Sequence, residues 1–233
     1  DILANEQSLL NVIKTELMEI RERYGDKRRT EIIGAVDDMT SEDLIAEETM
    51  VVTLSHTGYV KRSPLSEYRA QKRGGRGKTG AATKEDDFVS KLFVASTHAY
   101  LMPITTKGKL YSLKVHQIPA ASRTSRGKAM VNLVQFGEGE KLAQVLVTRD
   151  FPESRYVFFV TKKGVVKRTD LSAFENVRSS GIIALGIDDG DELVAVMITD
   201  GSKDILLSTA TGMSIRFPES EVRSMGRQAF GVK

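Results

Sequence analysis

The spacing of hydrophobic residues changes at about residue 30. Before that point, apolar residues recur every three or four positions, as on one face of an amphipathic helix: Leu9, Leu10, Ile13, Leu17 and Ile20. Arg21 and Arg23 suit the last turn of this helix, and Gly25 suits its end. We therefore predict a helical segment over residues 1–29, the end of a larger helical body, and a linker over residues 30–40.

Beyond the linker, the apolar runs are short and rich in Val, Ile, Leu and Phe, and clusters of Gly, Ser, Thr and Asp separate them. This pattern is typical of β-strands joined by turns. The runs are Met50–Leu54, Lys91–Ala95, Tyr100–Ile104, Leu142–Val147, Tyr156–Val160, Leu193–Ile198 and Ile205–Leu207. We expect no long helix after Thr30, so residues 41–233 are predicted to form an all-β domain.

The strands belong to a sequence repeat of roughly 50 residues. Each repeat has a turn of the form T/S-x-x-G, and these turns end at Gly58, Gly108, Gly164 and Gly212. A second glycine follows in each repeat, and an acidic turn opens a strand. The second glycines are Gly77, Gly127, Gly181 and Gly226. Such a repeat predicts a propeller-like stack of about four blades, each of which buries its faces against its neighbours.

The fourth repeat fits the pattern least well. Ser214 and Glu219 stand where the other three repeats have apolar residues. We therefore expect this unit to be the most diverged.

Composition excludes several classes of function. The 233 residues are 40% hydrophobic and 28% charged and contain no cysteine, which excludes disulfide scaffolds, thiolate zinc sites and cysteine nucleophiles. The three histidines, His56, His98 and His116, share no metal-ligand spacing. Tryptophan is absent, which argues against a platform for stacking single-stranded bases. We find no catalytic constellation and expect no metal and no cofactor in this segment.

Basic charge is concentrated in one glycine-rich stretch, although the net charge is only +3. Glycine lets backbone N–H groups approach a phosphate, and guanidinium groups fork onto its oxygens. The stretch therefore predicts contact with a nucleic-acid backbone without base readout; the alternative is a flexible basic loop with no partner. Its residues are Gln71, Lys72, Arg73, Gly74, Gly75, Arg76, Gly77 and Lys78. ATP binding is not expected there, because Lys72 occupies the place of the first glycine of a phosphate-binding loop.

The glycine turns predict a second basic set. In three repeats a cation stands four residues after the turn glycine, at Arg62, Arg168 and Arg216, and Lys61 and Lys167 precede two of these. If the blades repeat by rotation, these cations lie on one rim and follow a bent polyanion. The alternative is that they protect exposed sheet edges. A third patch, Arg123, Arg126 and Lys128, occupies the place of the glycine-rich stretch in the second repeat.

Several of these stretches resemble the C-terminal domain of the DNA gyrase A subunit. They are residues 42–45, Val51-Val-Thr-Leu-Ser-His-Thr-Gly-Tyr-Val-Lys61, Pro64-Leu-Ser-Glu-Tyr68 and Gln71-Lys-Arg-Gly-Gly-Arg-Gly77. The last of them is similar to the basic box of that family. Residues 24–32 resemble the junction with the breakage–reunion body of the family. The resemblance covers essentially the whole chain.

The resemblance implies a β-pinwheel, usually of six blades, around which duplex DNA wraps so that strand passage introduces negative supercoils. Four repeats would then make this domain incomplete at its C-terminal end. It also implies assembly with the rest of the A subunit, which forms a dimer, and with the B subunit, which hydrolyses ATP in a magnesium-dependent A2B2 enzyme. The catalytic tyrosine of the family lies upstream, so this segment should bend DNA without cutting it. The expected location is the bacterial cytoplasm, at the nucleoid.

Two alternatives remain at this point. The domain could instead resemble that of the topoisomerase IV A subunit, which typically lacks an intact box and whose DNA contact serves substrate choice. It could also be a propeller-like scaffold for protein interaction.

Overall fold

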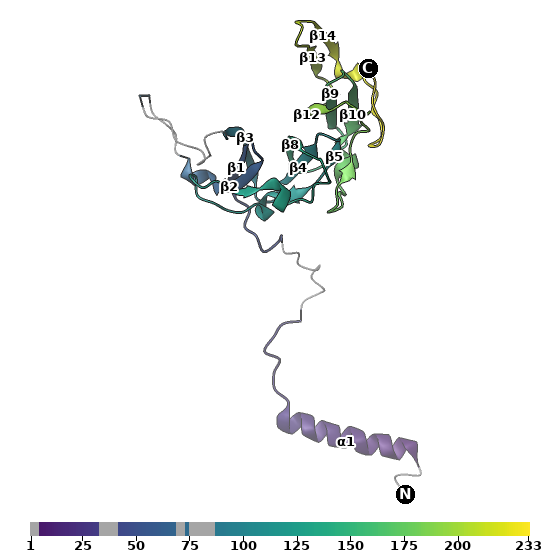
Figure 1. Cartoon of the computed structure of the whole chain (residues 1–233). Coiled ribbons are helices and arrows are strands. Elements are labelled where there is room, and N and C mark those ends of the chain that lie inside the picture. Colours follow the sequence, from purple (N-terminus) through teal and green to yellow (C-terminus); the bar gives the residue numbers. More distant parts are fainter. Residues whose placement is uncertain (1–4, 33–41, 69–72, 75–86) are drawn as a thin grey trace. The chain divides into compact units, whose positions relative to one another are not determined.

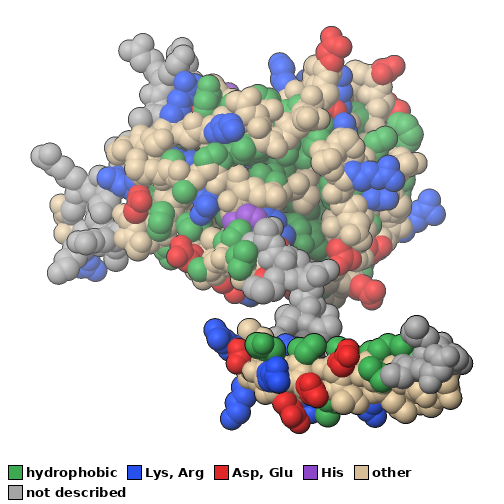
Figure 2. All heavy atoms as spheres, turned by 90° about the horizontal axis from the view of Figure 1, so that it is seen from below, with side chains coloured by type: hydrophobic (Ala, Val, Ile, Leu, Met, Phe, Trp, Pro, Cys, Tyr) green, Lys and Arg blue, Asp and Glu red, His purple; other side chains and the backbone are tan. Residues whose placement is uncertain are grey.

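The computed structural model describes residues 5–32, 42–68, 73–74 and 87–233 (Figure 1). The chain divides into two compact units, residues 1–40 and 41–233. The first unit contains α1 (Glu6–Tyr24), so the predicted helix is confirmed. The side chain of Asn5 caps its start by accepting a hydrogen bond from the Gln7 N–H (3.0 Å), and the Gly25 N–H donates to the Arg21 carbonyl at its end (2.8 Å). No residue of α1 is buried, and its hydrophobic side chains lie at the surface (Figure 2).

The described residues of the second unit form four successive antiparallel hairpins. Their strands are β1 (Thr49–Ser55) with β2 (Tyr59–Pro64), β4 (Tyr100–Thr105) with β5 (Lys109–Leu110) and β6 (Leu113–Lys114), β9 (Tyr156–Thr161) with β10 (Val166–Asp170), and β13 (Asp204–Ser208) with β14 (Ser214–Pro218). A short 3-10 helix follows each hairpin: Leu65–Glu67, Val115–Gln117, Leu171–Phe174 and Glu219–Glu221. The all-β prediction is therefore confirmed, and each predicted apolar run lies within or coincides closely with a strand.

A third long strand returns to the free side of each of the first three hairpins (Figure 1). These strands are β3 (Val89–Ser96) on β1, β8 (Leu142–Thr148) on β4 and β12 (Leu193–Thr199) on β9. A short strand from the following repeat completes the sheet on the other side: β7 (Lys128–Ala129) pairs with β2, and β11 (Ile182–Ile183) with β5. Val232 pairs with Val166 of β10 in the same way. Each of these segments therefore belongs to one repeat but pairs with the sheet of the preceding repeat, and we call it a lent segment.

The turn glycines take the conformation that the repeat predicts. Gly58, Gly108, Gly164 and Gly212 have φ values of +86°, +76°, +83° and +85°, which glycine adopts without steric cost. An acidic residue from the start of the third strand supports two of these turns. Asp87 accepts a hydrogen bond from the Thr57 N–H (3.0 Å), and Asp191 accepts one from the Lys163 N–H (3.0 Å). The acidic turns of the sequence thus secure the hairpins.

Among the described residues the hydrophobic core forms three clusters, and each cluster joins successive repeats. Alternate residues of β4 point to opposite faces, so Leu101 packs into the first cluster with Val52, whereas Met102 packs into the second with Val157. The third cluster joins Phe158 and Val160 of β9 to Ile205 and Val222 of the fourth repeat. No repeat could bury these side chains alone.

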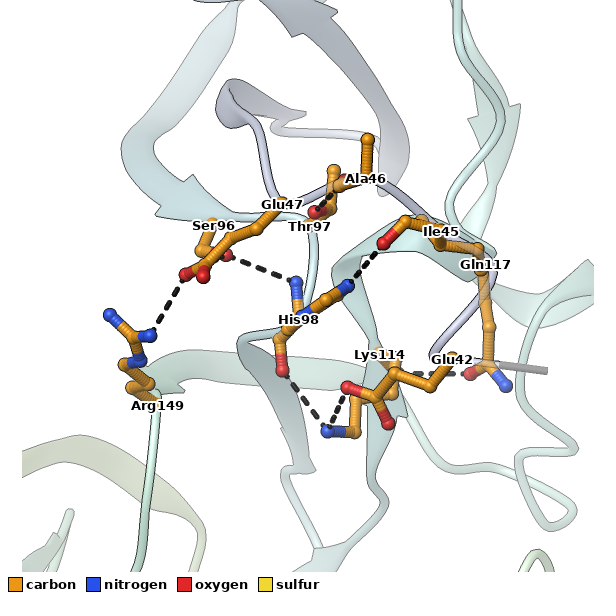
Figure 3. A network of polar contacts seen from close by, with 10 residues as sticks. All are labelled: Glu42, Ile45, Ala46, Glu47, Ser96, Thr97, His98, Lys114, Gln117 and Arg149. Atoms are coloured by element: carbon orange, nitrogen blue, oxygen red, sulfur yellow. Dashed lines mark hydrogen bonds and ion pairs between the residues drawn. The ribbon is translucent and has the colours of Figure 1, made fainter. Parts of the chain in front are cut away.

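The residues before β1 are attached to the first two repeats by a polar network (Figure 3). The Lys114 ammonium forms an ion pair with Glu42 (2.8 Å), and it lies 3.7 Å from the ring centroid of Tyr100. His98 Nε2 lies 2.8 Å from the Ile45 carbonyl oxygen, and the Thr97 hydroxyl donates to the Ala46 carbonyl (2.9 Å). His98 therefore has a structural role at this point.

The prediction for the second glycine of the fourth repeat is wrong. Gly127 and Gly181 have positive φ values, +89° and +77°, whereas Gly226 does not. The corresponding residue is Gly231, with φ +107°. A Cβ at Gly127 would lie 2.5 Å from the Val60 carbonyl oxygen, and one at Gly231 would lie 2.5 Å from that of Val166. Both glycines therefore mark the close approach of a lent segment to the preceding hairpin.

Glu219 is fully buried, although the corresponding residues of the other repeats are apolar. Its carboxylate accepts hydrogen bonds from the Thr199 hydroxyl (2.5 Å) and the Lys203 N–H (2.8 Å). These donors satisfy the buried carboxylate, so the fourth repeat keeps the fold while departing from the pattern.

Candidate nucleic-acid interface

The glycine-rich basic stretch falls mostly outside the described residues. Arg73 and Gly74 form an exposed turn, in which Gly74 has a φ of +78°. The remaining predicted contacts lie outside the described part of the chain: Gln71, Lys72, Gly75, Arg76, Gly77 and Lys78. Their role stays a prediction.

The three arginines that follow the turn glycines occupy one register position. Arg62 lies opposite Val52, Arg168 opposite Phe158 and Arg216 opposite Leu206. The expected equivalence of these positions is therefore confirmed; their contact with DNA stays a prediction.

The surroundings of these arginines differ. Arg216 is exposed and forms an ion pair with Asp204. Arg62 is half-buried, and its Nε donates to the Ile118 carbonyl (2.7 Å). The half-buried guanidinium of Arg168 lies 4.6 Å from the ring centroid of Tyr156. The three side chains share a position on the hairpin but differ in how far they reach into solvent.

The expectation that Lys61 and Lys167 are exposed rim cations is wrong. Neighbouring residues of a strand point to opposite faces, so Lys61 and Lys167 point away from the face of the arginines that follow them. Lys61 is 1% exposed, and its Nζ donates to the carbonyls of Ser122 (3.1 Å), Ser125 (2.7 Å) and Arg123.

Lys167 is fully buried, and its Nζ donates to the carbonyls of Ala184 (2.8 Å) and Arg227 (2.5 Å). Burial lowers the pKa of Lys167 from 10.5 to about 8, and it also lowers the pKa of Lys61. Both ammonium groups are therefore held by the backbone of a lent segment rather than by solvent. In the second repeat Tyr111 occupies this position, and its hydroxyl donates to Glu140 (2.9 Å).

The basic patch of the second repeat lies against the first hairpin. The Arg126 guanidinium stacks 3.7 Å from the ring centroid of Tyr59. The Arg123 N–H donates to Glu67 (3.0 Å), and Lys128 is exposed within β7. The lent segment thus brings three cations to the sheet edge at β2, where β7 pairs.

Two further arginines, missed in the sequence, line a hollow of about 660 Å³. Arg178 precedes Gly181, and Arg227 stands four residues before Gly231, as Arg123 does before Gly127. The signal was present in the sequence as this spacing, but the wrong choice of Gly226 concealed it. The hollow also contains the side chains of Asn176, Ser180 and Gln228, and no carboxylate lines it among the described residues.

Stacked antiparallel sheets that exchange segments between successive repeats define a β-propeller-type domain, with basic segments on its hairpins. The family described as "DNA gyrase C-terminal domain, beta-propeller" matches residues 49–96, 99–149, 155–200 and 203–233. The chain belongs to this family.

The individual relatives agree. The DNA gyrase A subunit of Halalkalibacterium halodurans is 46% identical over 232 residues, which cover 100% of this chain and 28% of that protein. The chain thus spans little more than a quarter of the length of this relative. Among solved structures, the C-terminal domain of DNA topoisomerase IV is 30% identical with a TM-score of 0.70, over 81% of this chain and 57% of that one. The DNA gyrase A C-terminal domain shares the fold at 24% identity and a TM-score of 0.63, over 79% and 59%.

No helix in the described part of the chain is both long and apolar enough to span a membrane.

Proposed function

We propose that this chain is the non-catalytic DNA-wrapping part of a DNA gyrase A subunit. Duplex DNA would bend along the basic hairpins, so that ATP-dependent strand passage in the whole enzyme introduces negative supercoils. The observation that carries the proposal is the shared register of Arg62, Arg168 and Arg216 on the first, third and fourth hairpins, together with the lent segment that bears Arg126. Cations that recur at one position of several hairpins suit a polyanion that curves past the blades.

The assembly belongs to the same proposal. The partners would be duplex DNA, the rest of a dimeric A subunit and the B subunit. The expected location is the bacterial cytoplasm. This segment would need no cofactor, and ATP and Mg²⁺ would act in the rest of the enzyme.

The energetics set the number of contacts that wrapping needs. Bending 20–30 base pairs costs on the order of 1–6 kcal/mol by smooth elastic estimates, so many phosphate contacts must offset it. Each neutralised phosphate contributes about 0.9 to the slope of log K against log salt. We therefore expect strong salt dependence and little preference for sequence.

A titration of a long duplex between about 50 and 200 mM salt tests the proposal. We expect Arg73→Ala with Arg76→Ala to reduce the salt slope and to abolish the topoisomer shift on a nicked plasmid that is religated with the protein bound. No binding at the lower salt concentration would instead favour a protein-interaction scaffold.

The topoisomerase IV alternative is the weaker one, because relatives that match the whole chain at 46–47% identity are DNA gyrase A subunits. A supercoiling assay on the reassembled enzyme with residues 71–77 deleted distinguishes the two. Loss of negative supercoiling with retained relaxation supports the gyrase role, and unchanged activity contradicts it.

A further inference from the structure

The hollow between residues 176–183 and residues 227–228 has the features of an anion site. Its volume of about 660 Å³ lies within the usual range of ligand pockets. Arg178 and Arg227 line it from two different repeats, and both residues are exposed. Among the described residues neither guanidinium takes part in an ion pair. Two guanidinium groups without a carboxylate partner, beside amide and hydroxyl side chains, form a set of donors that suits phosphate oxygens.

Both walls of this hollow are attached to one buried ammonium group. Lys167 donates to the carbonyl oxygen of Arg227 itself and to that of Ala184, the residue after β11. A buried ammonium needs hydrogen-bond acceptors, because an unsatisfied buried donor destabilises the fold. Lys167 therefore fixes the main chain of both segments at the points where they meet the hairpin.

The contact between the lysine and the following repeat also occurs two repeats earlier. Lys61 donates to the carbonyl oxygen of Arg123, which stands at the position that corresponds to Arg227. Gly127 and Gly231 then bring each segment back against the hairpin. Because the contact occurs twice, we infer that the lysine holds the lent segment in place and that the contact is not accidental.

We propose that Arg178 and Arg227 form a phosphate-binding site for duplex DNA and that Lys167 is its positioning residue. The inference rests on the proposed function, and it adds residues that would contact the DNA at the third blade. Lys167 does not touch the DNA; it fixes the segments from which the two arginines project.

Titration of a long duplex against the full chain at several salt concentrations tests this site. Replacing both Arg178 and Arg227 with Ala removes two contacts, so the slope of log K against log salt should fall by about 1.8. Arg155→Ala, at an exposed arginine outside the hollow, is the matched control and should leave the slope nearly unchanged. An unchanged slope in the double variant overturns the site, whereas failure of the wild-type protein to bind overturns the proposed function.

The positioning role needs a readout that a loss of stability would not change. We expect Lys167→Met to lower the salt slope toward that of the double arginine variant, measured where circular dichroism shows a folded protein. Added to the double variant, Lys167→Met should lower the slope no further. A normal slope in Lys167→Met, or an additive loss in the triple variant, overturns the role. If Lys167→Met does not fold, Lys167→Gln, which keeps a polar group but removes the ammonium, takes its place, and the same two outcomes decide.

Discussion

A methyl group at Gly127 tests whether the lent segment truly lies against the preceding hairpin. Gly127 has a φ of +89°, and its Cβ would lie 2.5 Å from the Val60 carbonyl oxygen and 3.0 Å from the Lys61 Cβ. Gly58 is the matched control, because its φ is +86° and nothing lies within 4 Å of its Cβ position. Both substitutions to Ala place a side chain in left-handed backbone, at a cost of about 1–2 kcal/mol. Only Gly127→Ala also forces two backbones apart.

The extra cost follows from the distance. Ordinary van der Waals contact begins at 3.4 Å, so the Val60 backbone and the segment must separate by about 0.9 Å. That shift disturbs the pairing of Lys128 with Val60 and the hydrogen bonds of the Lys61 ammonium. Overpacking of this kind costs about 1–3 kcal/mol, so we expect a total of about 2–5 kcal/mol for Gly127→Ala.

Urea unfolding followed by tyrosine fluorescence measures the difference between the two variants, since the chain has no tryptophan. The unfolding midpoint should fall further for Gly127→Ala than for Gly58→Ala at an unchanged m-value. Equal losses in the two variants would refute the close approach of the segment to β2.

The remaining predictions concern buried and exposed charges. Between pH 8 and 10.5 the lysine of the unfolded chain holds a proton that Lys167 lacks in the folded protein. The free energy of unfolding of the wild type should therefore rise, relative to that of Lys167→Met, by at most about 3 kcal/mol over this pH range. Urea unfolding at pH 8 and at pH 10.5 measures this difference between the two proteins, and a difference that does not change with pH contradicts the prediction. Burial alone would raise the pKa of Asp87, but hydrogen bonds from Thr57 and Phe88 outweigh it and lower the pKa. The stability contributed by Asp87 is therefore present above its unfolded pKa and is lost as the pH falls through the folded value, so urea unfolding should show Asp87→Ala destabilising the protein at neutral pH more than in acid. Glu219→Gln should cost about 1–3 kcal/mol in thermal unfolding, because the amide points an N–H at one of the two donors, and full stability would contradict the buried carboxylate. Arg216→Ala should change stability by less than about 1 kcal/mol, because its ion pair is exposed, yet lower the salt slope of DNA binding by about 0.9.

Local patterns in the sequence were sufficient for the long elements. The three- to four-residue spacing around Ile13 predicted α1, and apolar runs such as Tyr156–Val160 predicted the long strands. The turn glycines, for example Gly164, predicted the hairpins because a tight turn needs positive φ. Elements of two to four residues, such as β7 and the 3-10 helices, carry too little periodicity to be recognised.

The lent segments could not be predicted in the same way, because they depend on contacts between residues about 60 positions apart, as from Lys61 to Arg123. Lysine is seldom fully buried, so its ordinary behaviour favoured a rim position for Lys61 and Lys167. The candidate interface was therefore predicted in part. The repeat located Arg126 and the shared register of Arg62, Arg168 and Arg216, but it did not reveal which cations are buried.

The fourth hairpin shows what buries a lysine at this register position. Ile215 pairs across from Leu207 as Lys61 pairs across from Thr53, yet Ile215 is 60% exposed while Lys61 is 1% exposed. The difference lies outside the hairpin: residues 118–129 cover β2, whereas no described segment covers β14. Burial at this position is therefore imposed by the following repeat and not by the strand that carries the residue. A lysine suits such a position because its ammonium can donate hydrogen bonds to the carbonyl oxygens of the lent segment. The sequence of the hairpin alone does not reveal these acceptors.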